Sequence, residues 1–253
     1  MDRVYRIQTA AGGRHAIERD ARWYWLEGDL FGSYRTGEAI DAPPGLLLPP
    51  VAPSKIVAIG LNYQPHAEEM RKQVPDEPLM FLKPSTAAIG SGATIVLPPG
   101  VGQVDYESEM AVVIGRAAYR VPARDADRYI LGLTCMNDVT ARTLQRKDVQ
   151  YTRAKGFDTF APLGPCIAVG LDWRALDIEG SVNGVRRQAS NTRSMMFDVA
   201  TLIEFISFVM TLHPGDVIST GTPEGVGPLQ PGDVVTVKVH GIGELSNPVG
   251  EAR

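Results

Sequence analysis

Residues 105–115 read DYESEMAVVIG and carry the strongest structural signal in the chain. The apolar continuation predicts a buried strand over residues 106–114. Alternate residues of a strand share a face, so Glu107 and Glu109 are expected to point the same way, about 7 Å apart along the chain. Burial of two adjacent carboxylates is strongly unfavourable unless they are protonated or joined by a cation. By spacing alone the pattern is more typical of a solvated strand edge whose charges discourage aggregation, and a divalent-cation site is the other interpretation.

A third acidic residue follows another apolar segment. Residues 129–136 are apolar and predict a buried strand that ends in Asn137-Asp138. Asp138 is placed to complete a three-carboxylate site with Glu107 and Glu109, and its alternative role is in the first turn of the polar helix that follows. Hard oxygen ligands suit Mg²⁺, Mn²⁺ or Ca²⁺ and not Zn²⁺. Three protein carboxylates leave positions open for substrate, which is typical of a catalytic metal site.

A possible general base lies on a short helix. The segment PHAEEMRKQV predicts a helix over residues 65–74, with Pro65 near its first position and Asn62 as its cap. His66 and Glu69 are three residues apart, so they lie on one face of that helix. A carboxylate that orients an imidazole makes histidine a competent base for water. The alternative is an ordinary surface ion pair on a charged helix.

Other polar segments are less specific. The loop TGTPEGVG over residues 220–227 contains glycines that allow backbone N–H groups to approach an anion, although an ordinary hairpin explains it equally well. It lacks the Lys-Ser/Thr pair of a phosphate-binding loop, so nucleotide binding is not predicted. By spacing alone, Lys83, Arg142 and Lys155 are ordinary solvated side chains.

Composition limits the class of protein. The chain has 253 residues, 44% hydrophobic and 21% charged, as in an ordinary globular protein. The formal net charge of −4 favours neither nucleic acid nor an anionic membrane as a partner. No apolar run approaches the roughly 18 residues of a membrane-spanning helix, and the first residues lack the apolar core of a secretory signal. Cys135 and Cys166 have neither metal-site spacing nor disulfide density, so a cytoplasmic protein is expected.

The fold is expected to be strand-rich. Residues 1–50 alternate short strand-like pieces with glycine turns. A linker around residue 50 contains Pro49, Pro50 and Pro53, which exclude helix and central strand there. The prediction is a small N-terminal β-unit over residues 1–50, followed by a catalytic domain over residues 51–253. Asp198 is expected to cap a buried helix over 199–212. Many strands with few helices and no regular βαβ alternation predict an α+β fold.

Together the segments resemble the fumarylacetoacetate hydrolase family. The similarity spans residues 51–250, and its pieces appear in the family's order: GLNYQPHAEEM, FLKPSTAAIG, DYESEMAVVIG, MNDVTARTLQ, RAKGFDTFAPLGP, SVNGVRRQASNTRSMMF, PGDVISTGTPEGVG and GIGELSNPV. The resemblance implies a mixed β-roll or β-sandwich, the fold of the family's C-terminal domain, assembled as a homodimer. Residues 1–50 carry no motif that can be assigned.

The resemblance also implies roles for particular residues. Glu107, Glu109 and Asp138 match the family's metal ligands, usually for Mg²⁺, with Mn²⁺ or Ca²⁺ as alternatives. His66 and Glu69 match its catalytic dyad. Further matches are a catalytic lysine and three substrate contacts: Lys155, Arg142, Gln145 and Thr222. Thr143 and Gly156 depart from residues that many members carry, which affects the expected substrate preference and not the metal site.

The activity implied is hydrolysis of a C–C bond in 2,4-dioxo acids such as acylpyruvate or fumarylpyruvate, through a metal-stabilised enolate. His66 would activate water, and Lys155 with N–H groups near Thr222 would hold the oxyanion. The same site also suits decarboxylation of an oxaloacetate-like 2-oxo acid, or isomerisation of a 2-hydroxydienoate in aromatic catabolism. The alternative from another class is a non-catalytic protein that binds a divalent metal or a metabolite.

Overall fold

The computed structural model describes residues 1–42 and 47–252 and is rich in strands. The first strands are β1 (Asp2–Thr9), β2 (Gly12–Arg19), β3 (Arg22–Gly28), β4 (Tyr34–Ile40), β5 (Leu47–Leu48), β6 (Ile56–Gly60) and β7 (Leu79–Lys83). They are followed by β8 (Ala88–Ile89), β9 (Ile95–Leu97), β10 (Val104–Tyr106), β11 (Ser108–Ile114), β12 (Ile130–Asn137), β13 (Thr140–Ala141) and β14 (Ala161–Val169). The last are β15 (Asp177–Val182), β16 (Val185–Asn191), β17 (Val217–Ser219), β18 (Gly227–Pro228), β19 (Val234–Val239) and β20 (Gly243–Glu251). The α-helices are α1 (Gln64–Glu69), α2 (Arg142–Asp148), α3 (Thr152–Lys155) and α4 (Val199–Val209). Short 3₁₀ helices cover Ser85–Ala87, Ala123–Tyr129 and Thr192–Ser194.

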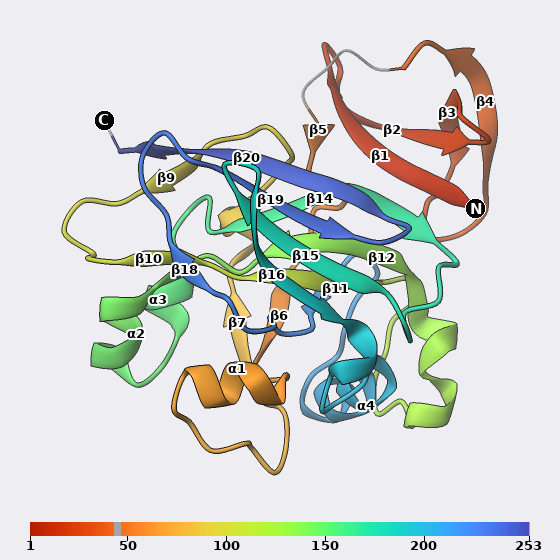
Figure 1. Ribbon diagram of the computed structural model, residues 1–253. Coiled ribbons are helices and arrows are strands. Elements are labelled where there is room, and N and C mark those ends of the chain that lie inside the picture. The colour runs from red at the N-terminus through yellow and green to blue at the C-terminus, as the bar shows by residue number, and fades with distance from the viewer. Residues whose placement is uncertain (43–46, 253) are drawn as a thin grey trace.

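The largest sheet runs in the order β4-β3-β2-β1-β14-β12-β11-β17-β6-β7. Its N-terminal part is a four-stranded meander that projects from the body of the molecule, at the upper right of Figure 1. The meander joins the main sheet because β1 pairs antiparallel with β14, with Val4 opposite Ile167. The small N-terminal β-unit is therefore hydrogen-bonded into the main sheet. The division into two domains at residue 50 stays a prediction.

A second sheet, in the order β16-β15-β19-β20-β9, packs against β11, β12 and β14. Strand β19 explains why: Val235, Val237 and Val239 are buried, whereas Val234 and Lys238 on its other face are exposed. The main core therefore lies between the two sheets, and it also contacts α4. This arrangement confirms the strand-rich α+β fold, a mixed β-roll, that the sequence predicted.

Two expectations about α1 are wrong. The helix predicted over residues 65–74 ends at Glu69, because Arg71 has a left-handed backbone with φ +53° that a helix cannot continue. Asn62 is not its cap: Tyr63 occupies that position without a side-chain hydrogen bond. The Asn62 side chain instead donates to the carbonyls of Phe197 and Thr220 and accepts from the Phe197 N–H.

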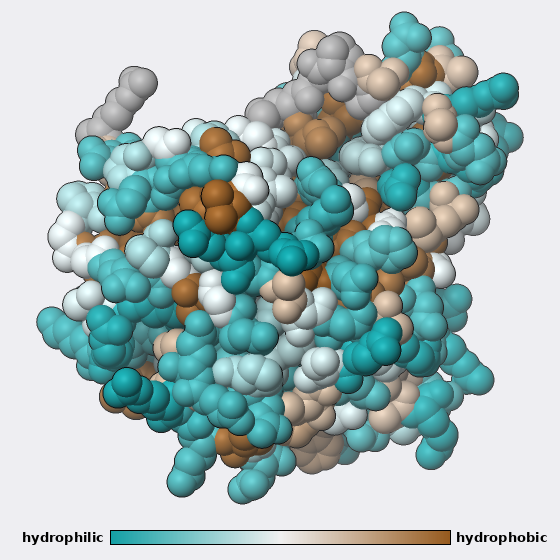
Figure 2. Space-filling view, in the orientation of Figure 1, coloured by the Kyte–Doolittle hydropathy of each residue, from teal (hydrophilic) through white to brown (hydrophobic). Residues whose placement is uncertain are grey.

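Helix α4 begins where the sequence predicted and ends earlier than expected. The Asp198 side chain accepts a hydrogen bond from the Thr201 N–H at 2.8 Å, which confirms its role as the N-cap. The helix ends at Val209, and Met210 is extended. Within residues 1–42 and 47–252, no helix is long and apolar enough to cross a membrane. The face seen in Figure 2 is mostly hydrophilic, with apolar residues in small groups.

Candidate active site

The acidic segment is an interrupted strand. The strand predicted over 106–114 breaks at Glu107, which lies between β10 and β11. The Glu107 N–H donates to Asn137 Oδ1 and the Asp138 N–H donates to the Glu107 carbonyl, both at 2.9 Å. Because β11 pairs with β12 and places Ser108 opposite Asn137, these bonds hold the backbones of Glu107 and Asp138 side by side.

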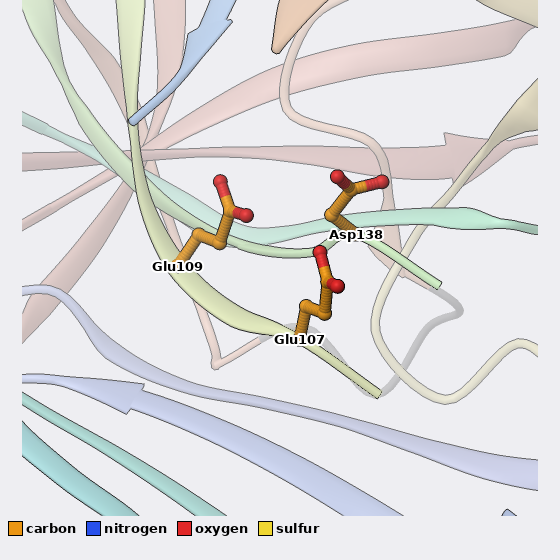
Figure 3. A group of neighbouring side chains, drawn as sticks. All are labelled: Glu107, Glu109 and Asp138. Carbon is orange, nitrogen blue, oxygen red and sulfur yellow. The ribbon is translucent and has the colours of Figure 1, made fainter. Parts of the chain in front are cut away.

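Three carboxylates converge at this point. Each of Glu107, Glu109 and Asp138 offers an oxygen, and these atoms all lie within 4.8 Å of one another. Figure 3 shows the three side chains directed at a common space from neighbouring strands. They are 4%, 1% and 0% exposed, so the interpretation as a solvated strand edge is wrong. Asp138 does not begin the following helix either, because α2 starts at Arg142.

Cationic side chains surround two of the three carboxylates. Lys155 Nζ donates to Glu107 Oε2 at 2.9 Å and to Asp138 Oδ2 at 2.5 Å. Lys83 Nζ, fully buried, donates to the other Asp138 oxygen. Arg142 lies with Nη2 2.6 Å from Glu107 Oε1. Burial alone would raise the pKa of Glu107, but the charges of Lys155 and Arg142 hold that pKa below its ordinary value.

Glu109 is different, because no cationic side chain of the described residues pairs with it. Its Oε2 accepts from the Ser219 hydroxyl at 2.5 Å and from the Gly221 N–H at 2.8 Å. Its Oε1 is buried without a hydrogen-bond partner in the part of the chain that the structure describes. Burial, reinforced by the charges of Asp138 and Glu107, raises the pKa of Glu109 well above its ordinary value.

The cluster therefore suits a divalent cation. Glu109 Oε1 is a buried carboxylate oxygen without a hydrogen-bond partner in the described residues, and two further carboxylates lie within reach of it. A cation bound between them would give this oxygen a partner. All the candidate ligand atoms are carboxylate oxygens, which Mg²⁺, Mn²⁺ and Ca²⁺ prefer. Glu107, Glu109 and Asp138 are the residues that would hold the ion.

His66 and Glu69 are in direct contact. His66 Nδ1 lies 3.0 Å from Glu69 Oε2, and His66 is 4% exposed. The other Glu69 oxygen, Oε1, accepts from the Gly225 N–H at 3.0 Å. The Gly225 carbonyl in turn accepts from the Tyr106 hydroxyl at 2.8 Å. One carboxylate therefore orients the imidazole and ties α1 to the loop that precedes β18.

A small chamber brings most of these groups together. It is lined by residues from several separate segments, among them His66, Glu107, Arg142, Gln145, Lys155 and Thr222. The structure thus places the expected base, one expected metal ligand and the expected substrate contacts on one cavity.

Two expected substrate contacts have defined hydrogen bonds. Thr222 Oγ1 donates to the Ser108 carbonyl at 3.0 Å and accepts from Gln188 Nε2 at 2.8 Å. Its hydroxyl is therefore already hydrogen-bonded within the protein. Gln145 Oε1 accepts from Arg142 Nη1 at 3.0 Å. The Gln145 amide nitrogen donates to no acceptor in the described residues, which leaves it available to a ligand.

The fold and the site both match one family. The fumarylacetoacetate (FAA) hydrolase C-terminal family model matches residues 55–250. The chain belongs to the fumarylacetoacetate hydrolase family. The resemblance noted in the sequence is therefore confirmed, and β1–β5 lie outside the part that matches the family model.

Relatives within this family include enzymes of different reactions. A mitochondrial oxaloacetate tautomerase of Arabidopsis thaliana is 42% identical over 203 residues, which is 78% of this chain and 91% of that protein. The structure of 5-carboxymethyl-2-hydroxymuconate delta-isomerase from Mycobacterium smegmatis is 44% identical, with a TM-score of 0.92 over 99% of this chain and all of that one. That of 2-hydroxyhepta-2,4-diene-1,7-dioate isomerase from Mycobacterium marinum is 40% identical, with a TM-score of 0.92 over 99% of both chains.

Sequence reasoning missed several residues of the site. Spacing alone gives Lys83 as a solvated lysine, yet it is buried against Asp138. The signal available was its position at the end of the apolar run Leu79–Leu82, directly before Pro84. Ser219, which holds Glu109, and Asp105, which accepts from Arg142 Nε at 2.8 Å, were not singled out for these roles either.

Proposed function

We propose that this chain is a divalent-cation-dependent hydrolase that cleaves a C–C bond in 2,4-dioxo acids, with Mg²⁺ as its ion. The observation that carries the proposal is the His66–Glu69 contact at 3.0 Å, on the same chamber as Glu107 of the carboxylate cluster. A base for water and a cation site that share one cavity are what this reaction needs. Family membership supports the class of reaction.

The chain's own residues account for the proton transfers. Because Nδ1 of His66 faces Glu69, the other ring nitrogen is free to take a proton from a water molecule. The water oxygen would attack the distal carbonyl, and cleavage of the adjacent C–C bond would leave its electron pair as the enolate of a 2-oxo acid. The proton that His66 took from water would return to the enolate carbon. Lys155 would stabilise the oxyanion formed at the attacked carbon. A bound divalent cation would supply Lewis-acid chemistry, by chelating the keto and carboxylate oxygens and stabilising the enolate.

The second candidate is proton transfer without hydrolysis, as in a tautomerase or isomerase, and a decarboxylase belongs to the same enolate chemistry. The similarity to an oxaloacetate tautomerase and to two isomerases favours it. His66 would take a proton from carbon or from an enol oxygen and return it elsewhere, and no water would be consumed. A cytoplasmic homodimer is proposed with either reaction.

The test is a panel of 2-oxo acids with Mg²⁺. Release of pyruvate from acetylpyruvate would support the hydrolase. Faster ketonisation of enol-oxaloacetate, or isomerisation of a 2-hydroxydienoate, with no pyruvate released from acetylpyruvate, would support the second candidate and contradict the first. Stabilisation by Mg²⁺ in melting curves, with no turnover of any acid, would contradict both and leave a binding protein.

A further inference from the structure

Gln188 on β16 is a buried amide whose side-chain hydrogen bonds all leave its own sheet. It is 1% exposed. Its Oε1 accepts from the Ser108 N–H at 2.9 Å, and its Nε2 donates to Thr222 Oγ1 and to the Pro223 carbonyl, both at 2.8 Å. A backbone N–H on one side and a backbone carbonyl on the other determine which amide atom is oxygen and which is nitrogen. The amide therefore has one orientation, in which both of its hydrogens are used.

The oxygen of this amide holds the backbone between Glu107 and Glu109. Strand β17 pairs with a later part of β11 and does not reach Ser108. The Ser108 N–H donates instead to Gln188, and the Ser108 carbonyl accepts from the Thr222 hydroxyl at 3.0 Å. Two side chains thus take the place of a neighbouring strand. Because Ser108 separates the two glutamates in the chain, these bonds fix the backbone from which both carboxylates extend.

The nitrogen of the amide holds the loop that supplies two further contacts of the site. In this loop the Gly221 N–H donates to Glu109 Oε2 at 2.8 Å, and the Gly225 N–H donates to Glu69 Oε1 at 3.0 Å. The two loop residues that Gln188 contacts lie between these glycines. The loop also lies close against β16, since a Cβ at Gly225 would be 3.3 Å from Gln188 Cγ. Gln188 therefore anchors the segment that carries both N–H groups.

This loop links the two parts of the site. Glu109 belongs to β11 and Glu69 to α1, and each accepts a hydrogen bond from the one loop. A displacement of the loop would move the base relative to a bound cation, and a misplacement of about 1 Å can cost about 10²-fold in rate. Gln188 lies outside the lining of the chamber, so it can act only through these residues and not on the substrate.

We propose that Gln188 is a positioning residue: it fixes loop residues 221–225 against β11 and thereby sets the position of the His66–Glu69 pair relative to the carboxylate cluster. Its effect on turnover rests on the proposed function. Its effects on cation binding and on the surroundings of His66 rest on the hydrogen bonds of the loop.

The experiment removes the amide and measures three properties of the full chain. Gln188→Met keeps the length of the side chain and loses all three hydrogen bonds. At saturating Mg²⁺, kcat for the oxo acid that the wild type turns over should fall by about tenfold or more, as for loss of a residue that orients a metal ligand. KM should change by less than about threefold, because Gln188 does not touch the substrate.

Two of the three readouts do not depend on turnover. Calorimetric titration of Gln188→Met should show Mg²⁺ binding about tenfold weaker than in the wild type. The imidazole NMR signal of His66, one of four histidines, is assigned by its loss in His66→Ala and should shift in Gln188→Met. Gln188→Asn keeps an amide that is too short to reach both partners. It should change all three properties in the same direction by a smaller amount, and it provides a test if Gln188→Met does not fold.

Asn247→Leu is the matched control for loss of a buried amide. Asn247 is 1% exposed and lies outside the lining of the chamber, and its Nδ2 donates to the carbonyls of Gly90 and Ala93, both at 2.8 Å. Asn247→Leu should lower the melting temperature as Gln188→Met does, but leave kcat, Mg²⁺ affinity and the His66 signal at their wild-type values.

The outcomes separate this inference from the proposed function. A lower melting temperature in Gln188→Met with wild-type kcat, Mg²⁺ affinity and His66 signal would overturn the positioning role and leave the proposed function standing. Equal losses of kcat in Gln188→Met and Asn247→Leu would overturn it as well. If the wild type turns over no oxo acid, the proposed function fails, whereas weaker Mg²⁺ binding and a shifted His66 signal in Gln188→Met would still support the positioning role.

Discussion

The ammonium nitrogen of Lys155 lies 2.9 Å from Oε2 of Glu107, inside the cluster that would hold the cation. Its positive charge also reaches Asp138, 2.5 Å away. Lys155 therefore supplies part of the charge that a divalent ion would otherwise provide. Glu109 forms no ion pair with a cationic side chain in the described residues, and this asymmetry distinguishes the expected effects of substitutions at the two positions.

Replacing Lys155 should strengthen cation binding while it impairs turnover. In Lys155→Met the carboxylates of Glu107 and Asp138 lose a nearby positive charge, so Mg²⁺ should bind more tightly by about threefold or more. Calorimetric titration with Mg²⁺ measures the change, and Lys147→Met is the control for loss of a surface charge. Weaker Mg²⁺ binding in Lys155→Met would show that the ammonium helps to hold the ion.

Glu109→Gln should lose the cation and still fold. The amide keeps the shape of the side chain but removes the negative charge of a carboxylate whose Oε1 has no hydrogen-bond partner in the described residues. Turnover should fall by more than about 100-fold, because loss of a residue that only supports a metal ligand already costs up to about 100-fold. Mg²⁺ should also no longer raise the melting temperature. Glu244→Gln, at an exposed ion pair with Lys238, is the control. Wild-type turnover in Glu109→Gln, or full activity in excess chelator, would contradict the metal site.

Loss of the imidazole should slow catalysis without weakening the metal site. His66→Ala should reduce hydrolysis by about 10²–10⁴-fold, the usual effect of removing a general base. Glu69→Gln should cause a smaller loss, since the amide still contacts the ring but no longer stabilises its protonated form. Mg²⁺ affinity should remain unchanged in both. Glu68→Gln, one residue away, is the control, and an unchanged rate in His66→Ala would remove His66 from the mechanism.

A buried carboxylate distant from the chamber should make stability depend on pH. Burial alone would raise the pKa of Asp216, but hydrogen bonds from Lys55, Ser54 and the His213 N–H hold that pKa below its ordinary value. A lowered pKa in the folded state stabilises the protein above about pH 4, and this stability is lost as the pH falls through the folded-state value.

Asp216→Asn should therefore lower the free energy of unfolding by about 3 kcal/mol at pH 7 and by less at pH 3. Urea unfolding at the two pH values measures the difference. Asp172→Asn removes an exposed carboxylate paired with Arg174 and should have little effect at either pH. An equal loss at both pH values for Asp216→Asn would contradict the lowered pKa.

Gly225 should be sensitive to a single added methyl group. A Cβ at Gly225 would lie 2.2 Å from the Arg187 carbonyl oxygen, where no side chain fits. Gly225→Ala should therefore displace the loop and break its bond to Glu69. It should lower kcat by about tenfold or more, less than the roughly 10²-fold or greater loss expected when the base is removed. Gly92→Ala is a matched control, because Gly92 also has a positive φ but open space around its Cβ position. Equal activity of the two variants would contradict the link between loop and base.

The carboxylate cluster could be predicted because its signals are local. Alternation along 105–115 places Glu107 and Glu109 on one side, and the apolar residues beside them indicate burial. The break in the strand at Glu107 could not be predicted, because it depends on hydrogen bonds with Asn137 and Asp138, about thirty residues away in the chain. The roles carried over from the family placed Lys155 and Arg142 on the chamber, which spacing alone did not.

Long-range partners explain the other differences. Asn62 has the right position and chemistry for a helix cap, but Phe197 and Thr220 compete for its amide from distant segments. Burial of Lys83 depends on Asp138, which directly follows β12. Asn62 and Lys83 therefore each form hydrogen bonds with segments that are distant in the chain. The local sequence does not reveal these partners, because they come close only in the folded protein.

The junction between β1 and β14 has a consequence for related chains. The matched family region begins at residue 55, and β14 within it pairs with β12 and also with β1. Strand β1 therefore covers the edge of β14 at Ile167–Val169, where backbone amides and carbonyls would otherwise face water. A shorter homologue without residues 1–42 must shield that edge with another segment or with a neighbouring molecule, or leave it open to intermolecular strand addition and aggregation.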